Sequence, residues 1–280
     1  DFVNKGYKLV EDGFTNSTED QKKFDSDAST DQEFVVKLAH DVTPVGPNNP
    51  HKPTEPINPN DPNSPRYPAE NQWKKDVTST VHYVVSDGKA TTPADKVQNA
   101  QWTRTLNVDK VTGEVLNPTE PWAANKANYD AVPTPGLTGY YADKASVASK
   151  TVTQENLEET VTYNPLGKLV PKPETPKDPN FPSTPEVKYP NDPNDPTKPG
   201  KPVVPNVPGY KPYLPDPNDP SKPGQPVEPG KPITPENPGK DTPIIYVPKT
   251  NDVTQPTKQT VKYTSTDGKA QVPSDKIQND

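Results

Sequence analysis

The side chains in this sequence that could do chemistry are scattered, and their spacings match no common reaction motif. The three histidines, His40, His51 and His82, lie far apart in the chain. There is no cysteine, and neither a Gly-x-Ser-x-Gly nor a phosphate-loop pattern occurs. Carboxylates are numerous, but a catalytic pair needs a packed cleft that shifts its pKa values. We therefore predict that the chain is not an enzyme and has no catalytic residues.

One acidic stretch presents oxygen ligands at alternate positions, as many calcium-binding loops do at their start. These candidate calcium ligands are Asp25, Asp27, Ser29 and Asp31. A standard helix–loop–helix calcium site also needs glycine at its sixth position and glutamate at its twelfth, where this chain has Thr30 and Val36. The alternative is a turn-rich acidic loop without a metal. Calcium is the only cofactor that the sequence suggests.

Aromatic residues near expected turns are candidates for stacking on sugar rings. The candidate glycan-binding residues are Trp122, Tyr140 and Tyr141. Neighbouring side chains on a strand point to opposite faces, so one of the two tyrosines should be exposed. The alternative is ordinary packing, because tryptophan is highly buried on average. Tyr83, Trp102 and Tyr163 fall on the apolar side of expected strands, and we predict that they belong to the core.

Composition limits the size of any core. The 280 residues include 42 prolines, only 27% are hydrophobic, and the mean hydropathy is −1.04. Ordinary globular domains are about 45–50% apolar, so we expect small modules rather than one large domain. The net charge of −7 disfavours nucleic acid as a partner, since phosphate binding needs a basic surface. No segment is apolar over the length of a membrane span, and we expect a monomer.

The elements that position these residues are predicted to be short strands, which makes the fold mostly β. Residues 76–165 form the only stretch with enough apolar residues for a complete module. Val77, Val81 and Tyr83 alternate with polar residues, as in a half-buried strand. Residues 1–43 contain two further strand patterns and resemble the end of another module.

The sequence repeats itself without a gap. The segment from Val81 to Ala90 returns as the segment from Val261 to Ala270, and the similarity continues beyond it at the same offset. A constant offset between similar segments is typical of tandem arrays. We therefore expect residues 253–280 to begin the next repeat, and the chain to be part of a longer array.

Prolines recur at every third residue in several stretches, which lie within residues 44–68, 173–185, 190–208 and 217–238. Polyproline II has three residues per turn, so this period predicts extended, solvated segments. We predict a linker over 44–75 and a polyproline II spacer over 166–252. A weak echo within the spacer suggests a reduced β mini-module at about 203–248, in which residues 244–246 pair with residues 210–214.

Several spaced motifs resemble the Mub repeats of lactobacillus mucus-binding proteins. They are Gly6–Phe14, Phe24–Asp27, Thr80–Tyr83, Trp102–Thr105, Pro121–Trp122, Gly139–Lys144 and Gly239–Pro243. Residues 1–43 are similar to the C-terminal part of a smaller, MucBP-type sub-domain. Residues 76–165 resemble a complete larger sub-domain, and 253–280 resemble the start of the next repeat.

The resemblance implies both fold and function. It implies β-grasp-like, that is ubiquitin-like, sub-domains in an extracellular adhesin that is anchored to the cell wall of a Gram-positive bacterium. The implied partners are host mucin glycans or other glycoproteins, and also immunoglobulins. The alternative function is that of a passive stalk that projects another adhesive domain from the cell wall.

Overall fold

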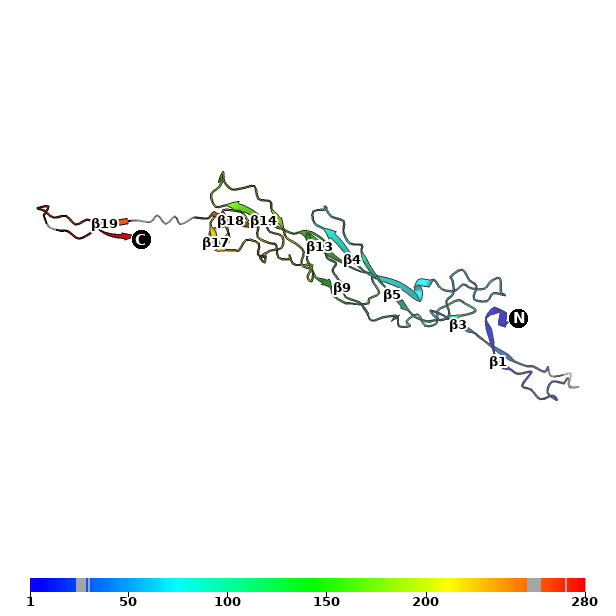
Figure 1. The fold of residues 1–280 in the computed structure, drawn as a ribbon. Coiled ribbons are helices and arrows are strands. Elements are labelled where there is room, and N and C mark those ends of the chain that lie inside the picture. The colour runs from blue at the N-terminus through cyan, green and yellow to red at the C-terminus, as the bar shows by residue number, and fades with distance from the viewer. Residues whose placement is uncertain (24–28, 30, 251–257, 270, 280) are drawn as a thin grey trace. The chain divides into compact units, whose positions relative to one another are not determined.

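Nearly all the regular secondary structure in the described part of the chain is β-strand, as the sequence predicts (Figure 1). The computed structural model describes residues 1–280 except 24–28, 30, 251–257, 270 and 280. In the described part the only helices are the 3-10 turns η1 (Val3–Lys5) and η2 (Glu70–Gln72), so no described helix could cross a membrane. The chain divides into two compact units. They are Asp1–Leu166 with Pro190–Gly200, and Gly167–Tyr189 with Lys201–Asp280.

The first unit contains a five-stranded sheet. In sheet order its strands are β10 (Tyr140–Ala142), β13 (Leu157–Pro165), β4 (Lys74–Val85), β5 (Lys96–Thr103) and β7 (Ala123–Ala124). Strands β4 and β13 are parallel at the centre, and all other neighbours are antiparallel. A central parallel pair made from the first and last strands, with antiparallel neighbours, is the β-grasp arrangement. The predicted fold class is therefore confirmed for this sheet.

Alternation of side chains explains how this sheet forms its core. Along β4, Val77, Val81 and Tyr83 are buried while the residues between them are more exposed, as the period of two requires. Val161 and Tyr163 of β13 are fully buried beside them. Tyr83 and Tyr163 are thus core residues, as predicted. Trp102 is only half-buried, and its indole N–H donates to the Thr153 carbonyl at 2.7 Å.

A mostly irregular stretch covers one face of the sheet where many β-grasp folds have a helix. Two short antiparallel ladders shape it. They are β8 (Asn128–Tyr129) with β12 (Lys150–Thr151), and β9 (Val132–Pro133) with β11 (Ser146–Val147). Tyr129 and Val152 pack with Val77, and Val132 packs with Val81.

A second ladder follows the N-terminal hairpin within the first unit. β1 (Tyr7–Asp12) and β2 (Val36–His40) are antiparallel, so both strands predicted there are present. β3 (Val42–Val45) then pairs with β6 (Leu106–Asp109). At the end of this ladder, Lys110 forms an ion pair with Asp41, and His40 Nδ1 lies 2.8 Å from Asp109 Oδ2.

Residues 44–75 are folded, and the prediction of an extended linker there is wrong. A single buried cluster unites this segment with β6. Its members are Val45, Ile57, Tyr67, Trp73, Leu106 and Val108. Side chains replace the ladder bonds that prolines remove: Ser64 Oγ accepts from the Asn58 backbone N–H at 2.7 Å, and Asn58 Nδ2 donates to the Lys110 carbonyl at 2.7 Å.

Part of the predicted spacer also belongs to the first unit. The segment 190–200 lies along β10, where the Ala142 N–H donates to the Pro196 carbonyl at 2.7 Å. Asn191 Oδ1 accepts from the Gly139 N–H at 2.8 Å, and its amide donates to the Tyr140 carbonyl at 2.7 Å. A proline-rich cover suits this position, because an edge strand otherwise exposes unpaired backbone groups.

The second unit contains another five-stranded sheet, so the predicted spacer over 166–252 is wrong for residues 168–248. In sheet order its strands are β15 (Val187–Lys188), β14 (Lys168–Pro173), β18 (Thr242–Pro248), β16 (Tyr210–Pro215) and β17 (Pro223–Pro226). The first and last strands, β14 and β18, again form the central parallel pair. The predicted pairing of residues 244–246 with residues 210–214 is confirmed for Ile245 and Tyr246 of β18, which face Tyr213 and Pro212 of β16. The sheet exceeds the predicted mini-module because β14 and β15 join it.

Short apolar runs between the prolines, of two to four residues, make this sheet possible. Leu169, Ile244 and Tyr246 are fully buried within the unit. Strand β18 pairs with β14 on one side and with β16 on the other. In both pairings every proline lies opposite a residue other than proline, so each facing pair retains at least one backbone N–H group. Proline spacing alone therefore does not exclude a packed sheet.

The two sheets share a local motif around a buried tyrosine. Tyr163 of β13 donates its hydroxyl to the Pro135 carbonyl at 2.6 Å, and Tyr246 of β18 donates to the Pro205 carbonyl at 2.6 Å. Shortly after each of these prolines, a glycine with positive φ leads into the next strand, Gly139 in one unit and Gly209 in the other. This motif accounts for the sequence echo between the two regions.

The hairpin near the C-terminus repeats the start of the first sheet. β19 (Lys258–Val261) pairs with β20 (Lys276–Asn279). Thr260 faces Ile277 in this hairpin, and Thr80 faces Val97 in the ladder of β4 and β5. These pairs occupy equivalent positions in the two sequence copies. The pairing register is therefore the same in both copies, which supports the tandem repeat.

The buried tyrosines predict the alkaline limit of stability. Burial raises the pKa of Tyr163 and Tyr246 to about 12. Their hydroxyls titrate near pH 10 in an unfolded chain, so stability should be unaffected below that pH and should fall as the pH rises from about 10 to 12. Phenolate absorbance should show these two tyrosines titrating last. A single titration near pH 10, identical with and without denaturant, would contradict the burial.

Candidate functional site

Trp122, a predicted sugar-stacking residue, is half-buried and contacts two cationic side chains. Lys75 Nζ lies 5.1 Å and Arg104 Cζ 4.7 Å from the ring centroid, within cation–π range. Arg104 is held in place by its bonds to the Gln72 carbonyl at 2.7 Å and the Pro118 carbonyl at 2.8 Å. The ring is thus fixed in position by charged neighbours.

Tyr140 and Tyr141 are both half-buried, so neither is the fully exposed tyrosine that the strand pattern predicts. The Tyr140 hydroxyl donates to Asp87 Oδ1 at 3.1 Å, and its ring packs against the core of the first sheet. Burial and the Asp87 carboxylate raise the pKa of Tyr140. Segment 190–200 lies against the backbone of β10, next to both tyrosines.

The structure does not bring the three glycan candidates together. Trp122 lies beside Lys75 at the start of β4, whereas Tyr140 contacts Asp87 just beyond the end of that strand. A strand rises about 3.3 Å per residue, so the ten residues from Lys75 to the end of β4 alone separate these positions by more than about 30 Å. They cannot line one sugar-binding site.

The calcium prediction stays untested. Asp25 and Asp27 lie outside the described residues, and Ser29 and Asp31 alone do not define a site. Elsewhere, among the residues that the structure describes, no group of three or more histidine or acidic side chains could hold a metal ion.

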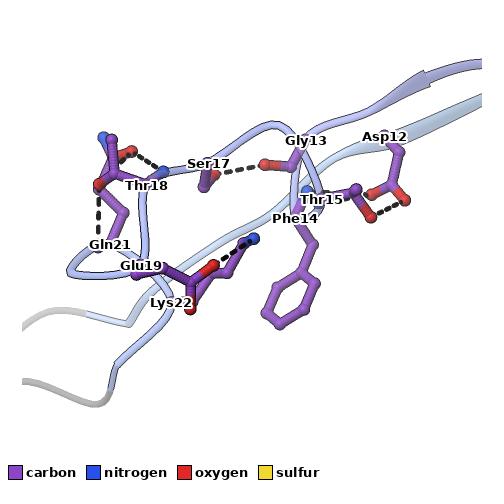
Figure 2. A network of polar contacts seen from close by, with 9 residues as sticks. All are labelled: Asp12, Gly13, Phe14, Thr15, Ser17, Thr18, Glu19, Gln21 and Lys22. Carbon is purple, nitrogen blue, oxygen red and sulfur yellow. Dashed lines mark hydrogen bonds and ion pairs between the residues drawn. The ribbon is translucent and has the colours of Figure 1, made fainter.

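The turn before the acidic stretch is organised by its own side chains (Figure 2). Asp12 Oδ1 accepts from the backbone N–H groups of Phe14 and Thr15 at 3.1 and 3.0 Å. Thr18 and Gln21 form a reciprocal capping pair, in which the Thr18 N–H donates to Gln21 Oε1 at 2.8 Å. The Asp12 carboxylate is therefore already used by the turn: the Thr15 hydroxyl also donates to it, and this bond together with the backbone bonds lowers the pKa of Asp12.

Each histidine pairs with a carboxylate, but no two of the three pairs share a residue. His40 lies near Asp109, His51 near Glu55 and His82 near Asp95, at 2.8, 2.9 and 2.7 Å. The pair of His51 and Glu55 lines a pocket.

That pocket has a volume of about 340 Å³ and lies in the first unit. His51 and Glu55 of the segment 50–55 line it together with Glu70 and Trp73. The sequence does not predict this site, because proline spacing makes 44–75 look like a linker. The one feature of the sequence that points to this site is an aromatic residue, Trp73, that follows a segment containing His51 and Glu55.

A larger and more open pocket of about 480 Å³ lies in the second unit. Lys177 contributes to it with a φ of 64°, an unusual backbone conformation for a residue other than glycine. Both carboxylate oxygens of Asp178 are engaged, by the Asn180 N–H at 2.9 Å and by the Tyr210 hydroxyl at 2.8 Å. The acceptor groups of Asp178 are thus used within the protein itself.

Two family models match different parts of the chain. The model of the Mucin binding domain matches residues 1–40, and that of the Muc B2-like domain matches residues 68–167. Together these matches span half of the chain. No curated protein matches it.

Similar solved structures are of the same kind. A MucBP domain of an adhesion protein from Pediococcus pentosaceus is 31% identical, over 32% of this chain and 97% of its own, with a TM-score of 0.28. The mucin-binding domain of Spr1345 from Streptococcus pneumoniae is 30% identical, over 33% of this chain and 92% of its own, with a TM-score of 0.29.

The type 2 repeat of the mucus binding protein MUB from Lactobacillus reuteri matches a longer region. It is 29% identical over 59% of this chain and 78% of its own, with a TM-score of 0.32. The family assignment rests on the sequence matches rather than on these superpositions. The chain belongs to the family of mucin-binding (MucBP) and Mub-repeat domains, as its motifs indicate.

Proposed function

We propose that the chain is a repeat segment of an extracellular bacterial adhesin that binds host mucin glycoproteins non-covalently. The observation that carries this proposal is the tandem order of a Mucin binding domain match at 1–40 and a Muc B2-like match at 68–167. The names of the similar structures, which include a mucus binding protein and a mucin-binding domain, point to the same partner.

The tandem repeat fits this function physically. Mucins present many similar glycans, and linked modules can raise apparent affinity by about 10²–10⁴ without any new contact. We also propose that residues 1–43 belong to a MucBP-type sub-domain and that 253–280 begin the next larger one. Cell-wall anchoring and immunoglobulin binding are further proposals that follow from the family.

Binding to immobilised mucin tests the proposal against the alternative of a passive stalk. The purified chain should bind mucin saturably, and glycans released from the mucin should compete. Deglycosylated mucin is the matched control and should bind much less. Failure of the folded chain to bind intact mucin saturably would favour the stalk.

Trp122 and Tyr141 are proposed as separate glycan contacts within that assay, because they are half-exposed at different parts of the sheet. Trp122→Ala and Tyr141→Ala should each weaken mucin binding only partly, since the two positions do not share a site. Melting curves of both variants check that the sheet is intact.

A further inference from the structure

The pocket beside Trp73 has features of a ligand-binding site. The mucin contacts proposed above do not involve it. Its walls come from two segments of the first unit, residues 50–55 and residues 70–73. Its volume of about 340 Å³ lies within the range of about 300–1,000 Å³ that is common for small-ligand sites. None of the sugar-stacking residues proposed above contributes to it.

Trp73 forms part of this pocket while its polar atom has no partner. The residue is 4% exposed, and Nε1 is buried without a hydrogen-bond partner in the described structure. Buried donors are nearly always paired in folded proteins, so an unpaired one calls for an explanation. A hydroxyl group bound in the pocket would supply an acceptor after a small movement of the ring.

Two carboxylates are oriented at the pocket by neighbouring side chains. Glu55 Oε2 lies 2.9 Å from His51 Nδ1, and Glu70 Oε1 accepts from Lys74 Nζ at 3.0 Å. A carboxylate has about four acceptor positions, so each of the two can also accept from a ligand hydroxyl. The His51 hydrogen bond lowers the pKa of Glu55, which keeps this acceptor ionised at neutral pH.

Contacts within the protein hold the segment 50–55 in place at the wall of the pocket. His51 stacks on Tyr67 with ring centroids 3.9 Å apart and planes only 3° from parallel. The Glu55 N–H donates to the Lys52 carbonyl at 2.9 Å, and proline fixes φ at positions 50 and 53. A preformed site loses little conformational entropy on binding.

Charge decides which class of ligand suits the pocket. The carboxylates of Glu55 and Glu70 are balanced by Lys52 and Lys74, so the site attracts neither a strong anion nor a strong cation. Carboxylate acceptors and an indole donor match the hydroxyls of a sugar, and the carbon surfaces of the prolines at positions 50 and 53 match its C–H groups. An acidic sugar would place its carboxylate near Glu55 or Glu70.

We propose that this pocket binds a terminal unit of a neutral, hydroxyl-rich saccharide, through Glu55, Glu70 and Trp73. This inference rests on the proposed function of glycan binding, and it names the site and the charge class of the glycan. The segment 50–55 would then contribute to ligand binding as well as to the folded structure of the first unit.

An NMR titration of the whole chain tests the site directly. The three tryptophans give three indole N–H signals, and Trp73→Phe identifies that of Trp73. N-acetyllactosamine should shift the Trp73 signal saturably, and its sialylated trisaccharide should do so more weakly. An unmoved Trp73 signal with the neutral sugar, or a stronger response to the acidic one, would overturn the proposal.

Matched variants separate the pocket from the rest of the surface. Glu55→Gln and Glu70→Gln should each weaken N-acetyllactosamine binding about tenfold, as expected for loss of a charged acceptor. Glu158→Gln changes an exposed carboxylate of the same unit and should leave binding unchanged. Equal binding by both pocket variants and the wild type would overturn the site.

A mucin-binding assay separates the proposal that the pocket binds a saccharide from the proposal that the chain binds mucin. If the chain binds mucin saturably but N-acetyllactosamine leaves the Trp73 signal unmoved, the pocket proposal is wrong and the adhesin proposal stands. If N-acetyllactosamine binds at the pocket but mucin does not bind the chain, the site stands and mucin is not the partner.

Discussion

Tyr246→Ala is expected to unfold the sheet of the second unit while the sheet of the first unit keeps its own melting transition. Tyr246 is fully buried in β18, and its hydroxyl donates to the Pro205 carbonyl at 2.6 Å. Truncating a large buried aromatic side chain costs about 3–5 kcal/mol. A sheet of this size has little stability to lose, since small domains bury a smaller share of their surface.

Thermal melting followed by near-ultraviolet circular dichroism measures this effect. Tyr263→Ala is the matched control, because it removes the same aromatic group from a side chain that is 42% exposed and outside both sheets. If Tyr246→Ala melts like the wild type, then β18 is not part of a packed core and the second unit is not folded as described.

Trp73→Ala is expected to destabilise the first unit by about 3–5 kcal/mol, the usual range for such a truncation. Trp73 is 4% exposed and packs with Val45, Ile57 and Leu106, so its loss removes the centre of the cluster that holds the segment 44–75. Chemical denaturation with tryptophan fluorescence as the signal measures the change in the free energy of unfolding.

Two comparisons sharpen this prediction. Trp102→Ala should be less destabilising than Trp73→Ala, because Trp102 is only half-buried. Trp73→Phe should recover much of the stability, since it keeps an aromatic ring and removes an N–H group without a partner. A larger loss for Trp102→Ala would show that residues 44–75 do not form a core.

Local alternation makes the first sheet predictable. Val77, Val81 and Tyr83 of β4 are buried as their spacing predicts, and the second copy of this sequence recurs with the same strand register. Alternation of apolar and polar residues within a strand predicts which of its side chains are buried, whichever strands lie beside it.

The proline-rich regions are harder to predict, because a high density of proline also indicates extended chain. Proline does disfavour ladders, but Leu169, Tyr189 and Val204 are buried residues in very short apolar stretches, and their partners are distant in sequence. The echo around Gly209 and Tyr246 was the usable signal, and it located only part of the sheet. Strands such as β14 and β15 escape periodicity because they are short or rich in proline.

The candidate site was less predictable than the fold. The pocket forms only when His51 and Glu55 approach Trp73, and no sequence spacing encodes that approach. Residue type makes Trp122 and Tyr140 candidates for sugar stacking, but they lie near different ends of β4. Side-chain type therefore indicated sugar-stacking candidates but not their grouping.

Amide hydrogen exchange of the second unit tests most directly whether the proline-rich chain is folded. The Tyr189 N–H donates to the Gly167 carbonyl at 2.9 Å, and the Val204 N–H donates to the Lys231 carbonyl at 3.0 Å. Both residues are buried, so we expect their amides to exchange far more slowly than those of an unfolded chain. Polyproline II has no internal hydrogen bonds, and exchange of both amides at the unfolded rate would contradict a folded second unit.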